Sequence, residues 1–241
     1  MKKVTATTLI AIAAGSLMAA DGKADIEAAA KKLSETANYS WTAKTESQNQ
    51  FREGDRDGKT EKGGYTVLNM AGREDQQIQA VLKGEKAVIK AGDTWQSAEA
   101  LAESDDQENR RMRFVARRVQ GFKVPHAEAQ DLIKHAADLK KDEDGIYTGK
   151  LTPEGLKAVY GRGFRRGGGD GGDGPDVSGL NGRVKFWLKD GAIAKYSRYI
   201  NGSMKFGDRD VEVDTTTTTE IKDVGSTKVT VPEDAKKKLG A

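Results

Sequence analysis

The chain contains no cysteine among its 241 residues. This absence excludes disulfide bonds, thiolate metal sites and thiol nucleophiles, and it leaves no cysteine to carry a lipid anchor after export. Histidine is almost as scarce, with only His126 and His135. They lie on one predicted helix at a spacing that points the rings to opposite faces, so they cannot share a metal. We therefore expect no transition-metal site and no cofactor.

Charge is absent between Val4 and Ala20, after the positively charged start Met1, Lys2, Lys3. A short apolar stretch behind two lysines, ending in small residues, is typical of a secretory signal peptide, and it is too rich in Thr, Ala and Gly to span a membrane. We expect residues 1–20 to be removed. The mature protein would then work in a bacterial periplasm or in the medium, where export without disulfides is ordinary.

An excess of positive charge is also missing from the expected mature chain. The full sequence has 40 basic and 37 acidic residues, and Lys2 and Lys3 fall within the predicted signal peptide. Removal of that segment leaves 38 against 37, a net charge of +1. Nucleic-acid binding depends on clustered positive charge, so we expect no nucleic-acid partner. No second apolar run is long enough to span a membrane, and residues 21–241 are expected to form one domain.

Hydropathy patterns predict an alternation of sheet and helix. Residues 25–37 show helical spacing, and about ten residues separate each of the strand and turn signals that follow, which is typical of an antiparallel meander. Asp57-Gly58, Asp190-Gly191 and Asn201-Gly202 are interpreted as three of the hairpin turns. Two helices are predicted in the middle, from Ser104 to Gly121 and from Pro125 to near Gly145, and a terminal helix is predicted over 233–239. A further short strand is predicted over 228–231.

A glycine-rich segment over 161–176 contains Arg, Phe and Asp and could be interpreted as an RNA-binding tract or as one unit of a calcium repeat. A single copy cannot build a calcium roll, and RNA is absent from the expected compartment, so we interpret it as a flexible loop. The arginines of the first central helix, 110, 111, 113, 117 and 118, could bind phosphate or anionic lipid, but the default for such a charge run is a solvated face. No nucleophile elbow, Walker loop or paired-carboxylate motif occurs, and we expect no enzyme.

Large side chains are concentrated on the predicted strands, where they would either build the core or line a ligand site on a concave face. The candidates for ligand-lining residues are Tyr39, Trp41, Tyr65, Trp95, Phe186, Leu188 and Tyr196.

Three segments resemble the LolA-like superfamily of bacterial envelope proteins, which includes periplasmic lipoprotein carriers and related lipid-binding or regulatory proteins. They are the strand and turn over 184–191, the Thr-rich strand leading to 221–225, and the segment 231–235, within a resemblance that spans most of residues 25 to 239. The resemblance implies an α+β fold in which a strongly curved antiparallel sheet, an open half-barrel, is covered by helices. It also implies a ligand such as a lipid or acyl chain between sheet and helices. The alternative is an interaction or sensory module that binds another envelope protein through the Arg-rich helix or the Gly-rich loop.

Overall fold

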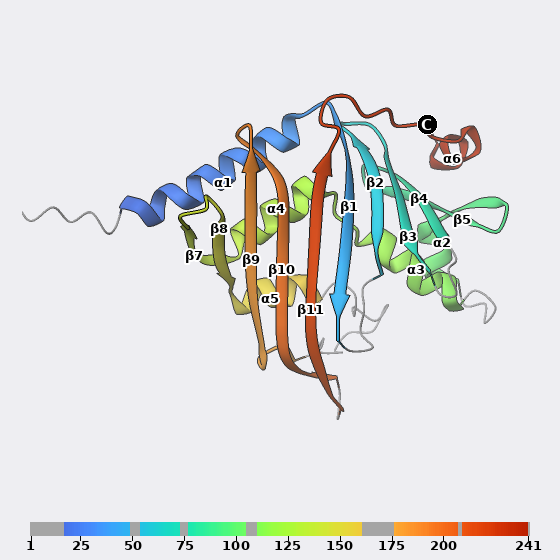
Figure 1. Ribbon diagram of the computed structural model, residues 1–241. Coiled ribbons are helices and arrows are strands. Elements are labelled where there is room, and N and C mark those ends of the chain that lie inside the picture. The colour runs from blue at the N-terminus through green and yellow to red at the C-terminus, as the bar shows by residue number, and fades with distance from the viewer. Residues whose placement is uncertain are drawn as a thin grey trace, which may run out of the picture.

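The computed structural model describes residues 17–48, 54–72, 77–104, 110–160, 176–206 and 209–240. Eleven strands within these ranges form one antiparallel sheet with the order β6-β5-β4-β3-β2-β1-β11-β10-β9-β8-β7. The first and last strands are not paired with each other, so the sheet is open (Figure 1). Its strands are β1 Asn38–Ser47, β2 Arg56–Glu61, β3 Thr66–Ala71, β4 Gln77–Lys83, β5 Lys86–Ala91, β6 Thr94–Ser97, β7 Ala136–Lys141, β8 Tyr147–Leu151, β9 Leu180–Lys189, β10 Ala192–Phe206 and β11 Arg209–Lys222.

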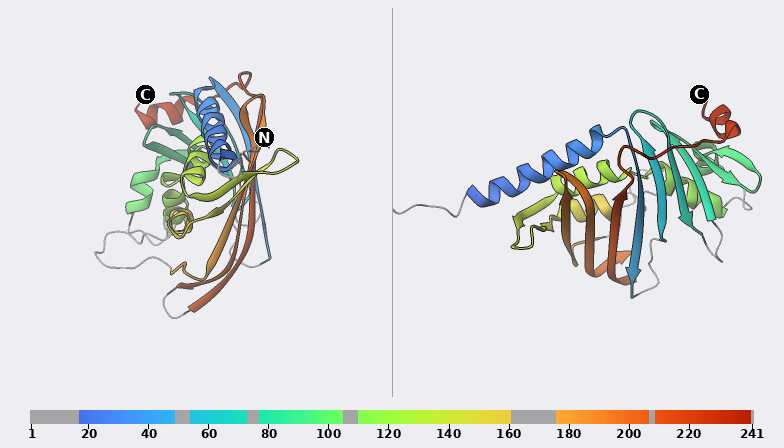
Figure 2. Two further views of the ribbon diagram at one scale, coloured as in Figure 1. Left: turned by 90° about the vertical axis from the view of Figure 1, so that its left-hand side faces the viewer. Right: turned by 45° about the horizontal axis from the view of Figure 1, so that its top comes forward.

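Five helices lie on one face of the sheet, which curves around them (Figures 1 and 2). They are α1 Leu17–Glu35, α2 Ala98–Glu103, α3 Arg110–Gln120, α4 Pro125–Lys134 and α5 Pro153–Tyr160. We call this helix-covered side the inner face. Its side chains and the apolar faces of the helices form one continuous hydrophobic core. The prediction of an α+β fold with a curved antiparallel sheet under helices is therefore confirmed.

A smaller core lies on the opposite, outer face. Helix α6, Glu233–Leu239, buries Ala235 and Leu239 against Val81 and Val88 of β4 and β5. Neighbouring residues in these strands, Ala80 and Ile89 among them, point instead into the inner core, because successive side chains of a strand alternate between faces. The boundaries of α6 are those that the sequence predicts.

The prediction of a hairpin turn at Asn201-Gly202 is wrong, because β10 continues through both residues to Phe206. Gly202 has a φ of 125° for a different reason. A Cβ on this residue would lie 2.2 Å from the carbonyl oxygen of Gly179. The glycine thus permits the chain before β9 to approach β10 closely, a role that sequence alone cannot separate from that of a turn.

Asp57-Gly58 is likewise no turn, because both residues lie inside β2, where Gly58 pairs with Trp41. A Cβ on Gly58 would come within 2.6 Å of the Trp41 indole and 2.5 Å of the Val67 carbonyl oxygen. The glycine provides the space in which the largest buried side chain of the core lies.

Further boundaries differ from the expectations, and the first helix begins at Leu17 and not at residue 25. The second central helix ends at Lys134 and not near Gly145, because residues 136–141 form the edge strand β7. Residues 228–231 are not a strand, since they lead to α6 without pairing with the sheet. Ser104 ends α2, a helix that the patterns did not predict, and residues 105–109, where the capping box would lie, are outside the described ranges.

Candidate functional site

The inner face is aromatic where the start of β1 meets the start of α4. We call this region the aromatic part. Trp41 on β1 is 2% exposed, and its ring stacks on Phe122 with centroids 5.5 Å apart. Its indole N–H donates to the hydroxyl of Thr60 on β2, at 3.3 Å. Phe122 is only half-buried and lies in the connection between α3 and α4. This connection is thus held on the sheet by a ring that reaches solvent on its other side.

Tyr39 fixes the first turn of α4. Its hydroxyl accepts from the backbone N–H of His126 at 3.4 Å and lies 2.8 Å from Nδ1 of the same residue. Either atom of the Tyr39–Nδ1 contact can be the donor, because a hydroxyl donates one proton and accepts at two lone pairs. Burial raises the pKa of Tyr39 and lowers the pKa of His126. Both groups are therefore neutral around pH 7.

A charged group lies next to these rings, in the contact between α4 and the long strands. Glu128 accepts from the Tyr196 hydroxyl at 2.7 Å and from Nη1 of Arg198 at 3.1 Å, and Nη2 of Arg56 is 3.8 Å away. The side chains of Glu128 and Arg198 are 17% and 10% exposed. Burial and the Glu128 carboxylate raise the pKa of Tyr196 well above its ordinary value, so this hydroxyl remains a donor. We call Arg56, Glu128, Tyr196 and Arg198 the polar belt.

The inner face becomes apolar again beyond the polar belt. Leu180, Ile200, Met204 and Val213 of β9, β10 and β11 are all buried in the inner core. These strands extend past α4 and α5 in Figure 1. The inner face thus carries an aromatic part, a polar belt and a lower apolar part in succession.

The seven candidate lining residues divide between the two faces. Tyr39, Trp41, Phe186 and Tyr196 are buried in the inner core, and Leu188 is partly buried against it. Tyr65 and Trp95 pack instead on the smaller outer core beneath α6. The five residues of the inner core therefore lie between the sheet and the helices, whereas Tyr65 and Trp95 do not.

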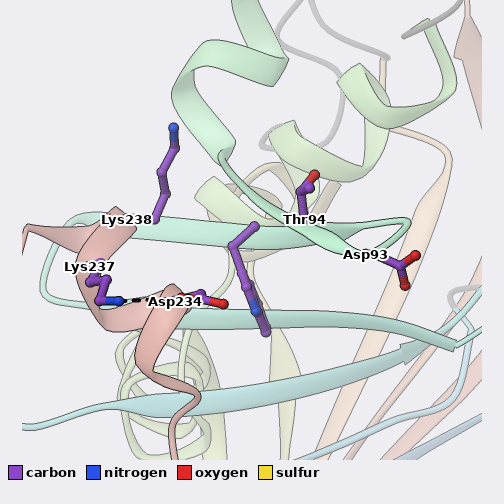
Figure 3. A pocket seen from close by; sticks show the side chains of 6 residues that line it. Asp93, Thr94, Asp234, Lys237 and Lys238 are labelled. Atoms are coloured by element: carbon purple, nitrogen blue, oxygen red, sulfur yellow. Dashed lines mark ion pairs between the residues drawn. The ribbon is translucent and has the colours of Figure 1, made fainter.

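Trp95 belongs to an open outer pocket with a volume of about 320 Å³. The other lining residues are Asp93 and Thr94 of the hairpin between β5 and β6 and Asp234, Lys237 and Lys238 of α6 (Figure 3). Lys237 pairs with Asp234 at 3.7 Å, whereas the Lys238 side chain points away from both. This small, strongly charged depression does not resemble a site for an apolar ligand.

Sequence patterns missed the polar belt and Phe122. Arg198 lies between Tyr196 and Ile200 in a strand whose alternate residues share a face. A charged residue at such an inward position could have indicated a buried polar contact. Glu128 was hidden in a helix start, where acids ordinarily complement the dipole. The two histidines lie at opposite ends of α4, His126 in its first turn and His135 at its C-cap.

The described residues contain no group of three His, Asp or Glu side chains arranged to hold a metal ion. Among the described helices, none combines the length and the hydropathy that a membrane-spanning segment needs. The glycine-rich segment 161–176 lies outside the described ranges except for Asp176, which pairs with Lys205.

The fold and the inner face define an open antiparallel sheet with one helix-covered side. Comparison with solved structures returns proteins of low sequence identity that match most of this chain. The lipoprotein LppX of Mycobacterium tuberculosis is 11% identical, with 88% of this chain and 99% of LppX covered at a TM-score of 0.49. LprF from Mycobacterium bovis is 11% identical, with 90% and 98% covered at 0.48. A LolA superfamily protein from Nitrosomonas europaea is 11% identical, with 87% and 94% covered at 0.35.

The architecture that the resemblance in the sequence implies, an open antiparallel sheet with helices on one face, is present. At these identities the likeness concerns the fold alone. No protein-family model matches the chain. No curated protein matches it by sequence.

We expect acid to weaken the fold through His126. Because its pKa in the folded protein lies below the unfolded value, the unfolded chain binds the proton more readily. The stabilisation is complete above the unfolded pKa of about 6.5 and is lost as the pH falls through the folded pKa, at up to about 1.4 kcal/mol per pH unit. Urea unfolding between pH 7.5 and 5.5 measures this slope.

The matched controls are His126→Gln and His135→Gln. The first should flatten the dependence in this window, because it removes the titrating ring beside Tyr39. The second should retain the wild-type slope. An unchanged slope in His126→Gln would show that another group causes the dependence.

Proposed function

We propose that the protein binds a hydrophobic or lipid-like ligand between the inner face of the sheet and helices α1, α3 and α4, and that it performs no catalysis. The observation that carries the proposal is the sequence of surfaces along the inner face: an aromatic part, the polar belt and a lower apolar part. In the structure these side chains pack against the helices in one core. A shift of the helices would expose mostly apolar walls with a few fixed polar groups, which are typical of ligand sites. An amphiphile has the same succession of apolar and polar parts.

The open sheet supports the same proposal. The two edge strands of the sheet are not paired with each other, so the helices alone cover the inner face. Contacts of α4 with the sheet include the Tyr39–His126 and Glu128–Arg198 pairs, which are side-chain contacts and not part of the sheet's own hydrogen bonds. A shift of the helices can therefore admit a ligand without breaking the strand pairing.

We also propose that the protein is exported and works in the periplasm, since its first twenty residues resemble a signal peptide. Ile26, Ala29, Ala30 and Leu33, which pack α1 into the inner core, all follow Ala20. Cleavage after Ala20 would leave these contacts intact.

Native mass spectrometry of protein purified from cell envelopes tests the ligand proposal. We expect a population heavier than the apoprotein by the mass of one lipid-like molecule, which organic extraction removes. The extracted protein should then take up a fluorescent fatty acid in a saturable manner. Protein that carries no lipid from the envelope and takes up no probe would contradict the proposal.

A further inference from the structure

Helix α3 presents an apolar side chain to solvent. Phe114 is 60% exposed, and within the described ranges Val224 is the only other large hydrophobic residue in that state. The opposite side of α3 buries Val115, Ala116 and Val119 in the inner core. The outward side of α3 is therefore not needed for packing.

Four arginines surround Phe114 on that outward side. At about 100° per residue, Arg110, Arg111, Arg117 and Arg118 fall on an arc of roughly 120° with Phe114 near its centre. Arg110, Arg111 and Arg118 are exposed, and Arg117 is partly exposed. A phenyl ring thus projects from the middle of a ring of guanidinium groups. We call these five residues the α3 patch.

In the part of the chain that the structure describes, three of the four arginines of the α3 patch have no acidic partner. Within the described ranges, Arg110, Arg111 and Arg117 form no ion pair, whereas Arg118 has an interaction partner. Three neighbouring cations repel one another, which costs free energy that an anionic partner would recover. Guanidinium groups bind phosphate oxygens in a bidentate manner, so phosphate is the anion that suits them best.

We propose that the α3 patch docks the protein on a membrane surface rich in anionic phospholipids. The arginines would lie at the headgroup phosphates, and Phe114 would enter the boundary with the acyl chains, as in interfacial amphipathic helices. A protein partner fits less well, because α3 is only about 16 Å long and protein interfaces exclude charge from their centres and need about 800 Å² per partner. This docking surface is separate from the inner face and does not depend on ligand binding there.

Vesicle co-sedimentation of the full chain tests the proposal. We expect the protein to sediment with vesicles of phosphatidylcholine and phosphatidylglycerol and not with phosphatidylcholine alone. We expect 0.5 M salt, which shortens the Debye length from about 8 Å to about 4 Å, to release it. Each basic side chain at an anionic surface contributes about a factor of five. The triple variant Arg110→Gln, Arg111→Gln, Arg117→Gln should therefore lower the partition coefficient on the order of 100-fold.

Two variants separate the α3 patch from general basicity. Phe114→Ala should lower partitioning several-fold without a change of charge. The triple variant Lys236→Gln, Lys237→Gln, Lys238→Gln removes the same charge from α6 and should leave partitioning within about twofold of wild type. Circular dichroism verifies the fold of each variant.

Three results would overturn the proposal. They are equal sedimentation with neutral and anionic vesicles, equal losses in the α3 and α6 triple variants, and a photo-crosslinker at position 114 that labels a protein and no lipid in cells. Loss of fatty-acid uptake with vesicle binding intact would contradict the proposed function of the inner face and leave the docking surface standing.

Discussion

Replacement of Glu128 by alanine should lower the free energy of unfolding by about 3 kcal/mol, the lower end of the range for breaking a buried ion pair. The carboxylate accepts from Tyr196 and Arg198 and faces Arg56, so its removal takes the counter-charge from the buried Arg198 and from the partly buried Arg56. We expect a loss at the lower end of that range because the Glu128 side chain is 17% exposed and its charge is partly solvated. Urea denaturation at pH 7 measures the change.

Glu128→Gln and Glu35→Ala are the matched controls. Glutamine keeps an acceptor for the Tyr196 hydroxyl and should lose less stability than alanine. Glu35→Ala removes an exposed carboxylate that pairs with Lys31, and it should change stability by less than about 0.5 kcal/mol. If Glu128→Ala proves as mild as Glu35→Ala, the polar belt does not hold α4 on the sheet.

Gly202→Ala should cost about 4 kcal/mol, because two penalties combine at this position. A φ of 125° is rarely adopted by residues with a side chain, at a cost of about 1 to 3 kcal/mol. The new methyl group would lie 2.2 Å from the Gly179 carbonyl oxygen, and such overpacking adds about 1 to 3 kcal/mol. Thermal or urea unfolding reports the sum.

Two other glycines isolate the separate penalties. Gly63 has a φ of 65° with no atom near its missing Cβ, so Gly63→Ala should cost about 1 kcal/mol from conformation alone. Gly58 has no positive φ but contacts Trp41 and Val67, so Gly58→Ala should cost about 1 to 3 kcal/mol from crowding alone. A loss in Gly202→Ala no larger than that in Gly63→Ala would disprove the close approach of the chain before β9.

The sequence predicts the architecture well where the signals are local. The Asp190-Gly191 turn between β9 and β10 is confirmed, since both residues have positive φ, as the favoured hairpin turn requires. Gly58 and Gly202 carry the same turn-like dipeptides but serve contacts with Trp41 and with Gly179. Those partners are distant in the chain, and no local pattern reveals them.

The candidate site was predictable only as far as local sequence patterns determine it. Period-two alternation shows that Phe186 and Tyr196 share a face, but it does not show which face the helices cover. Trp95 lies beneath α6 because residues 228–231 lead the chain end across to the outer face. The polar belt depends on α4 crossing β10 at Arg198, and such a crossing is a property of tertiary packing alone.

The most direct test of the proposed ligand site uses the positions of the three tryptophans. Trp41 lies on the inner face, whereas Trp95 packs on the outer core and Trp187 lies beside Lys195, one residue out of phase with the buried Phe186. The double variant Trp95→Phe, Trp187→Phe therefore keeps only the indole of Trp41, on the inner face. The single variant Trp41→Phe keeps the two indoles that lie away from the inner face.

Both variants are titrated with dibrominated stearate, whose bromines quench a nearby indole, and with ordinary stearate as the control. We predict saturable quenching of Trp41 by the brominated chain and little change in the Trp41→Phe variant. Unquenched Trp41 emission, or equal quenching in the two variants, would contradict a ligand site between the sheet and the helices.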